Sequence, residues 1–397
     1  MTVWRMVNPV MAYAWGSRDG IATIQGRPTS DKPEAELWMG AHPQAPSRLE
    51  SAAGASPSDL DELITADPVG VLGERCIERF GPRLPFLLKL LSADQPLSLQ
   101  VHPDDEQARR GFAAENAAGV GLDAAHRVYR DPFAKPEMLV AVTDFQVLVG
   151  FRAAPEAAAA LEALGIERLG PLVEDLLAGT PTGEVFLRLL DWTVDDRTAL
   201  VDEVRVAGSH RTWEPITPWI ESLSHQYPAD PGVVGVLLLN YLTLHPSQGL
   251  FVRPGQIHAY LSGTGVEILG SSDNVVRGGL TPKHVSTADV RAVLAVDAAT
   301  PWLVEPIEVV EAAGAASWEA WPVPQPEFQL RRLRVDGDCQ ISPRGPAVLL
   351  CLEGKVELDD TDQRVTLGPG ESAFVPASAT VLAVGGNGML ICANPGS

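Results

Sequence analysis

Short apolar runs separated by Gly, Pro and Asp recur at both ends of the chain, and this rhythm limits the possible fold more than any other feature. In the first 152 residues the runs are Pro85–Leu91, Leu97–Val101, Glu137–Val142 and Gln146–Phe151. Runs of this length that are bounded by turn-forming residues are typical of β-strands. We therefore expect the start of the chain to be mainly β.

The middle of the chain has a different character. An alanine-rich segment begins near Pro155, and its Leu161 and Leu164 stand at helical spacing. Residues Thr193–Val206 repeat the pattern, with acidic residues early and an apolar stripe after them. We expect a helical insertion over about 153–230, followed by a return to strands from Leu238, first in 249–261 and later in the tail.

The tail has the regular rhythm of a small β domain. Five strand candidates are separated by Gly, Pro and Asp turns, namely Ala347–Leu352, Gly354–Leu358, Arg364–Leu367, Ser372–Val375 and Met389–Cys392. Short strands at such even spacing favour a sandwich or jelly roll. The tail is expected to fold as a unit of its own.

The length of the chain and its apolar pattern limit its architecture and location. At 397 residues, of which 45% are hydrophobic, it exceeds the usual size of a single core, so we expect two or three domains. The longest apolar run, Val233–Leu239, is much shorter than the roughly 20 residues of a membrane helix. The N-terminus has no apolar stretch typical of a secretion signal. We expect a cytoplasmic protein that does not bind membranes.

Charge and cysteine content exclude other classes of protein. The formal net charge of −21 opposes binding to nucleic acid, because the field of the protein repels phosphate polyanions. A small anionic substrate would need a local basic patch. The four cysteines (Cys76, Cys339, Cys351 and Cys392) are too few and too scattered for a disulfide framework, so buried or spare thiols are expected.

A pair of polar residues in one apolar run has the spacing of metal ligands. Gln100 and His102 are two residues apart, and residues i and i+2 of a strand point to the same face. The amide oxygen of Gln100 and a ring nitrogen of His102 can therefore converge on one point. Taken alone, a glutamine and a histidine in a strand are more often hydrogen-bonded residues than ligands, so the spacing leaves both interpretations open.

Two further residues complete a candidate metal site. Glu137 opens an otherwise apolar strand, where an unpaired carboxylate would be costly to bury. His258 follows a Pro-Gly turn that ends the strand 250–252. The set contains no thiolate, so it suits Zn²⁺ first, with Mn²⁺, Fe²⁺ and Co²⁺ also possible. A site of this composition is expected to keep an open position for water or substrate.

The segment 265–283 is predicted to be a loop that carries charged and amide side chains. Arg277 is followed by two glycines, which allow a ligand to approach the backbone closely, and Arg and Lys are the natural partners of phosphate. In so acidic a chain an anion would bind here. The alternative is a solvated turn with an arginine salt bridge. His42, in a Gly-Ala-His-Pro turn, is left without an assigned role.

Seven motifs in a fixed order resemble type I mannose-6-phosphate isomerase, also called phosphomannose isomerase. They read Tyr13-Ala-Trp-Gly-Ser, Ala35-Glu-Leu-Trp-Met-Gly-Ala-His-Pro, Pro85-Phe-Leu-Leu-Lys-Leu-Leu-Ser, Leu97-Ser-Leu-Gln-Val-His-Pro-Asp, Lys135-Pro-Glu-Met, Pro254-Gly-Gln-Ile-His-Ala-Tyr-Leu-Ser-Gly and Ser272-Asp-Asn-Val-Val-Arg-Gly-Gly-Leu-Thr-Pro-Lys. One departure is Arg277-Gly-Gly, where many members have Arg-Ala-Gly. The motifs span residues 13 to 283.

The resemblance implies a mainly β fold with an α-helical insert, consisting of two cupin-type jelly-roll β-sandwich domains and a helical domain. The catalytic cupin would comprise residues 1–152 and 231–318, the helical domain 153–230, and a degenerate cupin 319–397. The tail segment that begins at Gly370 resembles the second cupin motif but has no histidine after Pro376. The C-terminal domain is therefore expected to bind no metal and to serve in packing.

The resemblance also implies the site residues and one Zn²⁺ per chain. The family's zinc ligands fall on Gln100, His102, Glu137 and His258, and its active-site arginine falls on Arg277. Family accounts place substrate contacts at positions that are Ser98, Lys89, Lys135, Tyr260, Asp273 and Lys283 here. The base that moves the proton stays open among Glu267, Asp273, Lys135 and a metal-bound water, with Lys135 or Glu267 favoured.

The expected activity is an aldose–ketose isomerisation of mannose 6-phosphate and fructose 6-phosphate, which feeds mannose into glycolysis or supplies GDP-mannose synthesis. Removal of a proton beside a carbonyl gives a cis-enediol intermediate, whose negative charge a divalent ion and Arg277 would stabilise. We expect a monomer with a phosphosugar as its partner. A cupin metal-dependent oxygenase and a non-enzymatic sugar-binding cupin are the alternatives, and the glutamine ligand and the cationic segment argue against the first.

Overall fold

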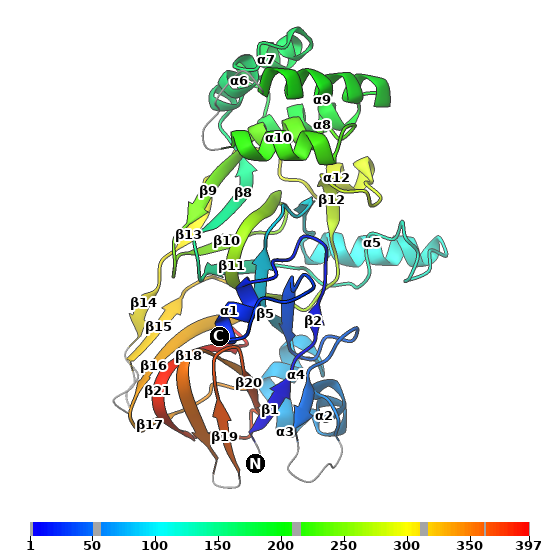
Figure 1. The fold of residues 1–397 in the computed structure, drawn as a ribbon. Helices are drawn as coiled ribbons and strands as arrows, with labels where there is room; N and C mark the ends of the chain where they lie inside the picture. The colour runs from blue at the N-terminus through cyan, green and yellow to red at the C-terminus, as the bar shows by residue number, and fades with distance from the viewer. Residues whose placement is uncertain (1–2, 51–56, 209–215, 310–316, 361–362, 397) are drawn as a thin grey trace.

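The computed structural model describes residues 3–50, 57–208, 216–309, 317–360 and 363–396. Strands dominate both ends of the chain, and a group of helices occupies the middle of it, at the top of Figure 1. The prediction of a mainly β protein with a helical stretch between its strand regions is therefore confirmed. In the described parts of the chain no helix is long and apolar enough to cross a membrane.

One sheet, here called the cleft sheet, carries most of the predicted site residues. Its main path, in order across the sheet, is β13 (Trp302–Val304), β10 (Gly249–Val252), β7 (Glu137–Ala141), β11 (His258–Gly270), β5 (Phe86–Ala93), β3 (Glu36–Met39) and β2 (Val10–Met11). Four more strands pair off this path, namely β6 (Leu99–Val101), β8 (Phe145–Phe151), β9 (Leu239–Leu244) and β12 (Val276–Gly279). The paired strands are antiparallel, and β5 and β7 are buried along their whole length.

The long strand β11 connects the two parts of the cleft sheet. Its first residues pair with β6 and β8, and from Gly263 onward it pairs with β5 and β7. An irregularity in register between Tyr260 and Ser262 marks the change of partner, and bulges of this kind bend a strand. The predicted loop over 265–283 is therefore wrong for 265–270 and for 276–279, because Glu267 lies in β11 and Arg277 lies in β12.

The second sheet, here called the C-terminal sheet, contains the tail and also the start of the chain. Its strands are β14 (Ile307–Val309), β15 (Ser317–Trp321), β16 (Gln329–Asp336), β21 (Leu382–Asn394), β18 (Ala347–Asp359), β20 (Ser372–Val375), β1 (Trp4–Val7) and β4 (Arg48–Glu50), with β17 (Cys339–Ile341) and β19 (Arg364–Leu367) beside them. Two of the predicted strands are joined in β18. Strand β1 pairs with β20, so the first residues of the chain complete a sheet built mainly from its last.

The helices expected in the middle of the chain are present. They are α6 (Ala154–Glu162), α7 (Gly170–Leu177), α8 (Thr182–Leu190), α9 (Val194–Gly208), α10 (Thr217–Gln226) and α11 (Gly232–Gly235), with 3-10 turns η1 (Glu167–Leu169) and η2 (Val236–Leu238). Their leucines and valines pack into one core with strand residues of the cleft sheet, including Leu99, Leu148 and Ala259. The helical group thus packs against β6 and the first part of β11, which carry Gln100 and His258.

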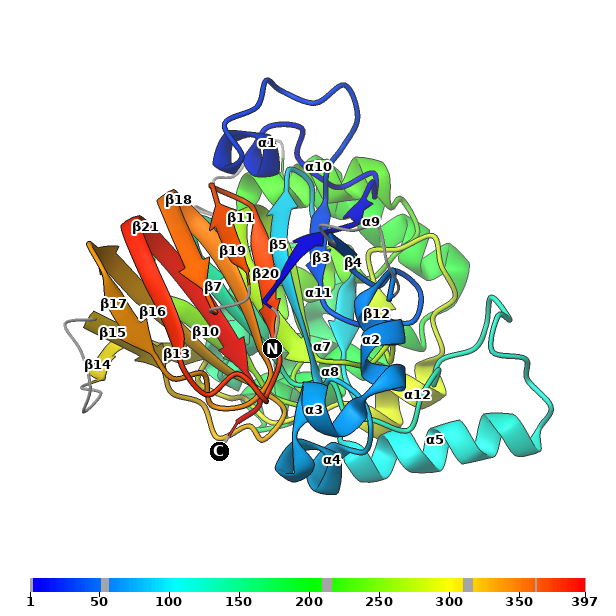
Figure 2. The same ribbon diagram turned by 90° about the horizontal axis from the view of Figure 1, so that it is seen from below.

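Several helices outside this group were not predicted. They are α1 (Gly20–Ile24), α2 (Leu60–Ala66), α3 (Pro68–Leu72), α4 (Glu74–Phe80), α5 (Asp105–Ala117) and α12 (Thr287–Val293). Helix α5 begins with a capping box, in which Asp104 and Gln107 each accept a hydrogen bond from the backbone N–H of the other. Figure 2 shows α2, α3 and α4 beside the C-terminal sheet, and the N–H of Ala377 donates to the carbonyl of Val71 at 2.8 Å.

Candidate active site

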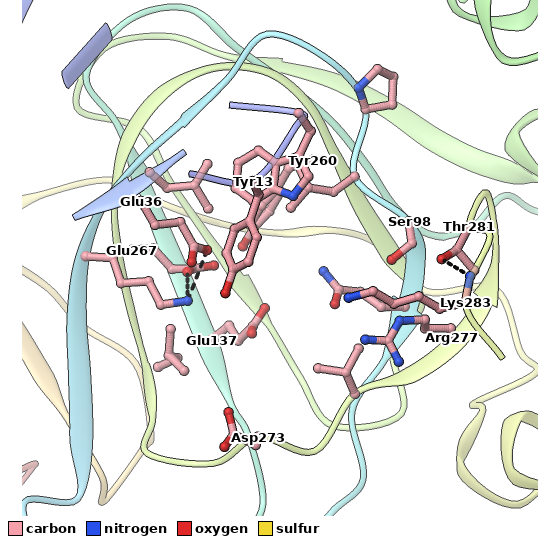
Figure 3. A pocket seen from close by; sticks show the side chains of 18 of the residues that line it. Tyr13, Glu36, Ser98, Glu137, Tyr260, Glu267, Asp273, Arg277, Thr281 and Lys283 are labelled. Carbon is pink, nitrogen blue, oxygen red and sulfur yellow. Dashed lines mark hydrogen bonds and ion pairs between the residues drawn. The ribbon is translucent and has the colours of Figure 1, made fainter. Parts of the chain in front are cut away.

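A cleft of about 640 Å³ opens on the cleft sheet and takes its walls from segments distant in sequence. Most of the predicted site residues line it, namely Ser98, Lys89, Gln100, Lys135, Glu137, Tyr260, Glu267, Asp273, Arg277 and Lys283. Figure 3 shows Ser98, Arg277 and Lys283 on one side, Glu36 and Glu267 on the other, and Glu137 between the two groups. The two remaining predictions, His102 and His258, lie buried next to Glu137.

His102, Glu137 and His258 form a buried cluster with the geometry of a metal site. Nε2 of His102 lies 3.2 Å from one carboxylate oxygen of Glu137, and Nε2 of His258 lies 3.2 Å from the other. The three side chains are at most 2% exposed, and one ligand atom from each lies within 4.8 Å of the others. Strand β11 supplies His258, the start of β7 supplies Glu137, and His102 directly follows β6.

The hydrogen bonds of the two rings determine which nitrogen faces the carboxylate. Nδ1 of His102 lies 2.8 Å from the carbonyl of Asn274, and Nδ1 of His258 lies 3.1 Å from the carbonyl of Gln256. A carbonyl only accepts, so each Nδ1 carries the proton and each Nε2 presents a lone pair when the ring is neutral. Burial lowers the pKa of His102 to about 4, which keeps that ring neutral near pH 7.

These lone pairs converge with no proton between them. Nε2 of His102, Nε2 of His258 and one oxygen of Glu137 have no hydrogen-bond partner, although all three atoms are buried. Such groups are costly to bury unless a cation binds them. Two imidazoles and a carboxylate are a donor set that Zn²⁺ prefers, and the carbonyl bonds to Nδ1 orient the rings in the way that zinc sites require. The residues present therefore fit a divalent metal.

Gln100 occupies a register position that suits a fourth ligand. In the ladder it pairs with His258 of β11 on one side and with Arg277 of β12 on the other, and its side chain lines the cleft. Strand pairing therefore places Gln100 between His258 of the metal cluster and Arg277. Ligation by Gln100 stays a prediction.

Lys135 and Glu137 are paired beside the cluster. Nζ of Lys135 lies 3.0 Å from a carboxylate oxygen of Glu137, and both side chains are buried. Burial alone would raise the pKa of Glu137, but the charge of Lys135 and the contact with His102 hold it well below its usual range. Glu137 is therefore a carboxylate, the form that binds a cation.

Lys89 is held between two carboxylates at the far side of the cleft. Its Nζ lies 3.2 Å from an oxygen of Glu36 and 3.2 Å from an oxygen of Glu267, and Glu36 also accepts a hydrogen bond from the indole of Trp38 at 2.7 Å. Burial opposes the charge, but the two glutamates raise the pKa of Lys89 above its usual value. Burial raises the pKa of Glu267. Lys89 thus has carboxylate partners already, and its predicted contact with substrate stays a prediction.

The opposite side of the cleft is cationic. Arg277 and Lys283 line it, and Arg130, which we had not predicted, lines it with them. Burial lowers the pKa of Arg277 and of Lys283, and the charge of Arg130 lowers both further. Three cations that repel one another beside a cleft form a site for a multivalent anion.

Sequence reasoning missed residues that position the site residues through hydrogen bonds. Asn274 is fully buried, and its side-chain oxygen accepts from the N–H of Arg130 at 2.7 Å while its carbonyl orients His102. Asp131 accepts from the N–H of Asp273 at 2.7 Å. A polar residue within a motif, such as Asn274, was a usable signal. Nothing in the sequence around Arg130 sets it apart from a surface arginine.

Comparisons with known proteins place the chain in a family. The model of the phosphomannose isomerase type I catalytic domain matches residues 3–154, and that of the mannose-6-phosphate isomerase cupin domain matches residues 320–395. The mannose-6-phosphate isomerase of Escherichia coli strain K12 is 37% identical over 394 residues, which cover 97% of this chain and 98% of that protein. The chain belongs to the type I mannose-6-phosphate isomerase family. The resemblance seen in the sequence is thereby confirmed.

Solved structures of mannose 6-phosphate isomerases have the same fold. A crystal structure of a zinc-bound mannose 6-phosphate isomerase matches with a TM-score of 0.89 at 33% identity and covers all of both chains. The enzyme of Salmonella typhimurium strain LT2 is 35% identical over 392 residues, 97% of this chain and 98% of that protein. The match to the cupin-domain model shows that the C-terminal region contains a cupin domain.

Proposed function

We propose that this chain interconverts D-mannose 6-phosphate and D-fructose 6-phosphate through a cis-enediol intermediate, with one Zn²⁺ held by Gln100, His102, Glu137 and His258. One observation supports this most strongly. Two ring nitrogens, of His102 and His258, and one oxygen of Glu137 are buried without hydrogen-bond partners, beside a cleft with a cationic side. Family membership over the full chain favours the isomerase over an oxygenase or a sugar-binding protein.

The two sides of the cleft suit the two ends of a sugar phosphate. Arg277, Lys283 and Arg130 would bind the phosphate by charge-assisted hydrogen bonds, with Ser98 beside them. The sugar would then extend toward Glu137 and toward the buried Lys89 with its two glutamate partners. A zinc ion bound by the cluster that contains Glu137 would supply a Lewis acid for the carbonyl and hydroxyl oxygens at C1 and C2.

Lys135 and Glu267 are the proposed proton carriers. Glu267 has a raised pKa, which makes it a better base near neutral pH than an ordinary carboxylate, and the buried Tyr260 interacts with it. Lys135 lies closer to the metal cluster. The test compares solvent hydrogen exchange at C1 and C2 of the sugar in Lys135→Met and Glu267→Gln. If both variants keep full exchange, neither residue is the base.

The test of the function is a coupled assay for fructose 6-phosphate with the full chain. We expect activity that is lost after chelation and restored by added Zn²⁺. Zinc content per chain, measured before and after chelation, should follow the activity at one ion per chain. Activity that survives complete removal of the metal would contradict the proposal.

The proposed organisation is a catalytic cupin of residues 1–152 and 231–318, a helical domain of 153–230, and a metal-free degenerate cupin of 319–397, both cupins being jelly rolls. The helical range includes residues 209–215, which lie outside the described part of the chain. The pairing of β1 with the C-terminal sheet would tie the two cupins together. We further propose a cytoplasmic monomer that binds neither nucleic acid nor membranes, in keeping with its charge of −21.

A further inference from the structure

The turn after strand β3 fixes His42 in the wall of the cleft. The N–H of Ser47 donates to the carbonyl of Gly40 at 2.9 Å, and the hydroxyl of Ser47 accepts from the N–H of Gly40 at 3.0 Å, which closes the turn. The imidazole of His42 is buried and lies edge-on to Trp38, with ring centroids 4.8 Å apart. The ring therefore has a packed and defined position.

The hydrogen bonds of His42 direct a proton at Asp273. The backbone N–H of Gln44 donates to Nδ1 of His42 at 3.3 Å, so the proton of the neutral ring is on Nε2. Nε2 lies 3.3 Å from one carboxylate oxygen of Asp273. The side-chain amide of Gln44 donates to the other oxygen at 3.0 Å. One donor from this turn thus faces each oxygen of Asp273.

Asp273 is held from its backbone as well and still faces the cleft. Its N–H donates to Asp131, and Asp273 is among the residues that line the cleft, below Glu137 in Figure 3. Its side chain is 30% exposed. Each carboxylate oxygen has two lone pairs, so the pairs that the turn does not use can accept hydrogen bonds from a ligand.

The charged groups around Asp273 come from three segments. His42 faces it from the turn after β3, Lys135, Arg130 and Asp131 act from the segment before β7, and Tyr13 acts from the N-terminal segment. Burial raises the pKa of Asp273, but the contact with His42 and the charges of Lys135 and Arg130 lower it below its ordinary value. Loss of His42 would leave the two cations in place, so the pKa of Asp273 would rise only in part.

We propose that His42 is a positioning residue that, with Gln44, holds Asp273 as an ionised acceptor for a hydroxyl group of the sugar phosphate. The role rests on the proposed function, since it requires a sugar in the cleft. A carboxylate repels a phosphate, whereas it accepts from an uncharged hydroxyl, so Asp273 would bind the carbon chain while the cationic side binds the phosphate. Because its pKa is lowered, Asp273 is a weaker base than Glu267, which separates this role from that of the base.

The experiment compares two replacements of His42 in the full chain loaded with Zn²⁺. His42→Phe keeps a ring against Trp38 but removes the donor, and His42→Gln keeps a donor. For His42→Phe we expect KM for mannose 6-phosphate to rise about tenfold, with a smaller change in kcat, as for one hydrogen bond to a charged group. The acid limb of kcat/KM should move to higher pH, because the pKa of Asp273 rises. His42→Gln should restore most of both values.

The controls separate this role from a structural one. His245→Phe removes a similar contact, 3.0 Å from Asp144, at an exposed site outside the lining of the cleft, and it should change neither KM nor the acid limb. If His42→Phe does not fold, Gln44→Leu tests the same clamp at an exposed residue and should raise KM in the same direction. Unchanged KM and acid limb in the folded variants, or no rescue by glutamine, would overturn the proposal.

A second measurement does not depend on activity. Histidine-selective ¹⁵N NMR of the wild-type chain should show His42 protonated on Nε2 and unprotonated on Nδ1, and Asp273→Asn should perturb that ring more than any exposed histidine. A proton on Nδ1 would overturn the clamp even in an active isomerase. A wild-type chain that fails to isomerise mannose 6-phosphate would overturn the proposed function instead, and this is seen before any variant is assayed.

Discussion

The cleft sheet and the C-terminal sheet both contain long strands, but the side chains at the buried positions of these strands differ in polarity. Strands β11, β18 and β21 are each 13 residues long and largely buried. In β11 the buried positions include His258 and Glu267, whereas Leu350 of β18 and Leu390 of β21 fill comparable positions with leucine. The fold therefore requires the strand pattern alone, and a few polar residues at buried positions determine whether a sheet can do chemistry.

The largest effect is expected from removal of the charge that holds the cluster together. Glu137→Gln keeps the size of the side chain but loses the carboxylate, so we expect loss of most bound zinc and a fall in kcat of about a thousandfold or more, as several kcal/mol of charge stabilisation imply. Metal analysis and the coupled assay measure both. The matched change in the C-terminal sheet, Glu319→Gln, removes the negative charge from a 2.7 Å ion pair with Arg332 and should leave activity intact.

The difference between the sheets also shows how much the sequence could predict. Apolar runs bounded by turn residues located strands such as β5, β7, β18 and β21 but missed β1 to β4 and β12 to β17. The Gln100 to His102 spacing with Glu137 and His258 identified a set of which three members form a cluster in the structure. The strand predictions succeeded because apolar runs bounded by turn residues are a local signal, whereas the convergence of Gln100 with His102 stays a prediction.

Predictions failed where the answer depends on distant partners. That Glu267 lies in a strand follows from its pairing with Leu139 of β7 and Lys89 of β5, which no local pattern reveals. The contact of Asp273 with His42 joins residues more than 200 positions apart. The missed helix α5 is a different case, because its capping box at Asp104 and Gln107 is a local signal that was overlooked.

Equal cavities in the two sheets should have unequal consequences for catalysis. Leu390→Ala in the C-terminal sheet and Leu139→Ala in the cleft sheet both remove a fully buried side chain, so each should lower the free energy of unfolding by about 2 to 5 kcal/mol. Urea denaturation followed by circular dichroism measures this. Only Leu139→Ala should also lower kcat per folded molecule, since Leu139 pairs with Glu267. A fall in kcat for Leu390→Ala would mean that the two sheets are coupled in catalysis.

Arginine plays a different part in each sheet. Arg277→Ala should lower kcat/KM for mannose 6-phosphate by about a hundredfold, because charge-assisted hydrogen bonds to an anion are lost. Inhibition by inorganic phosphate should weaken in parallel, which tests the anion site without a sugar. Arg334→Ala, at an exposed position of β16, is the control and should change neither value. Equal phosphate inhibition in wild type and Arg277→Ala would place the anion elsewhere.

The smallest effect concerns the alkylation rates of the buried thiols. Cys76, in the first part of the chain, and Cys351, in the C-terminal sheet, should react at similar rates. Burial raises the pKa of Cys76 and of Cys351 to about 11. At pH 8 the thiolate fraction is then about a hundredfold below that of an ordinary cysteine. A thiolate with a higher pKa is also more nucleophilic, which offsets part of the loss in thiolate fraction. Alkylation should therefore be about tenfold slower in the native chain than in urea.

The rate of alkylation should rise with pH until about pH 11, and mass spectrometry of iodoacetamide-treated protein measures it at each cysteine. The half-buried Cys339 should react before both, and rapid labelling of Cys351 at pH 8 would show that the C-terminal sheet opens locally.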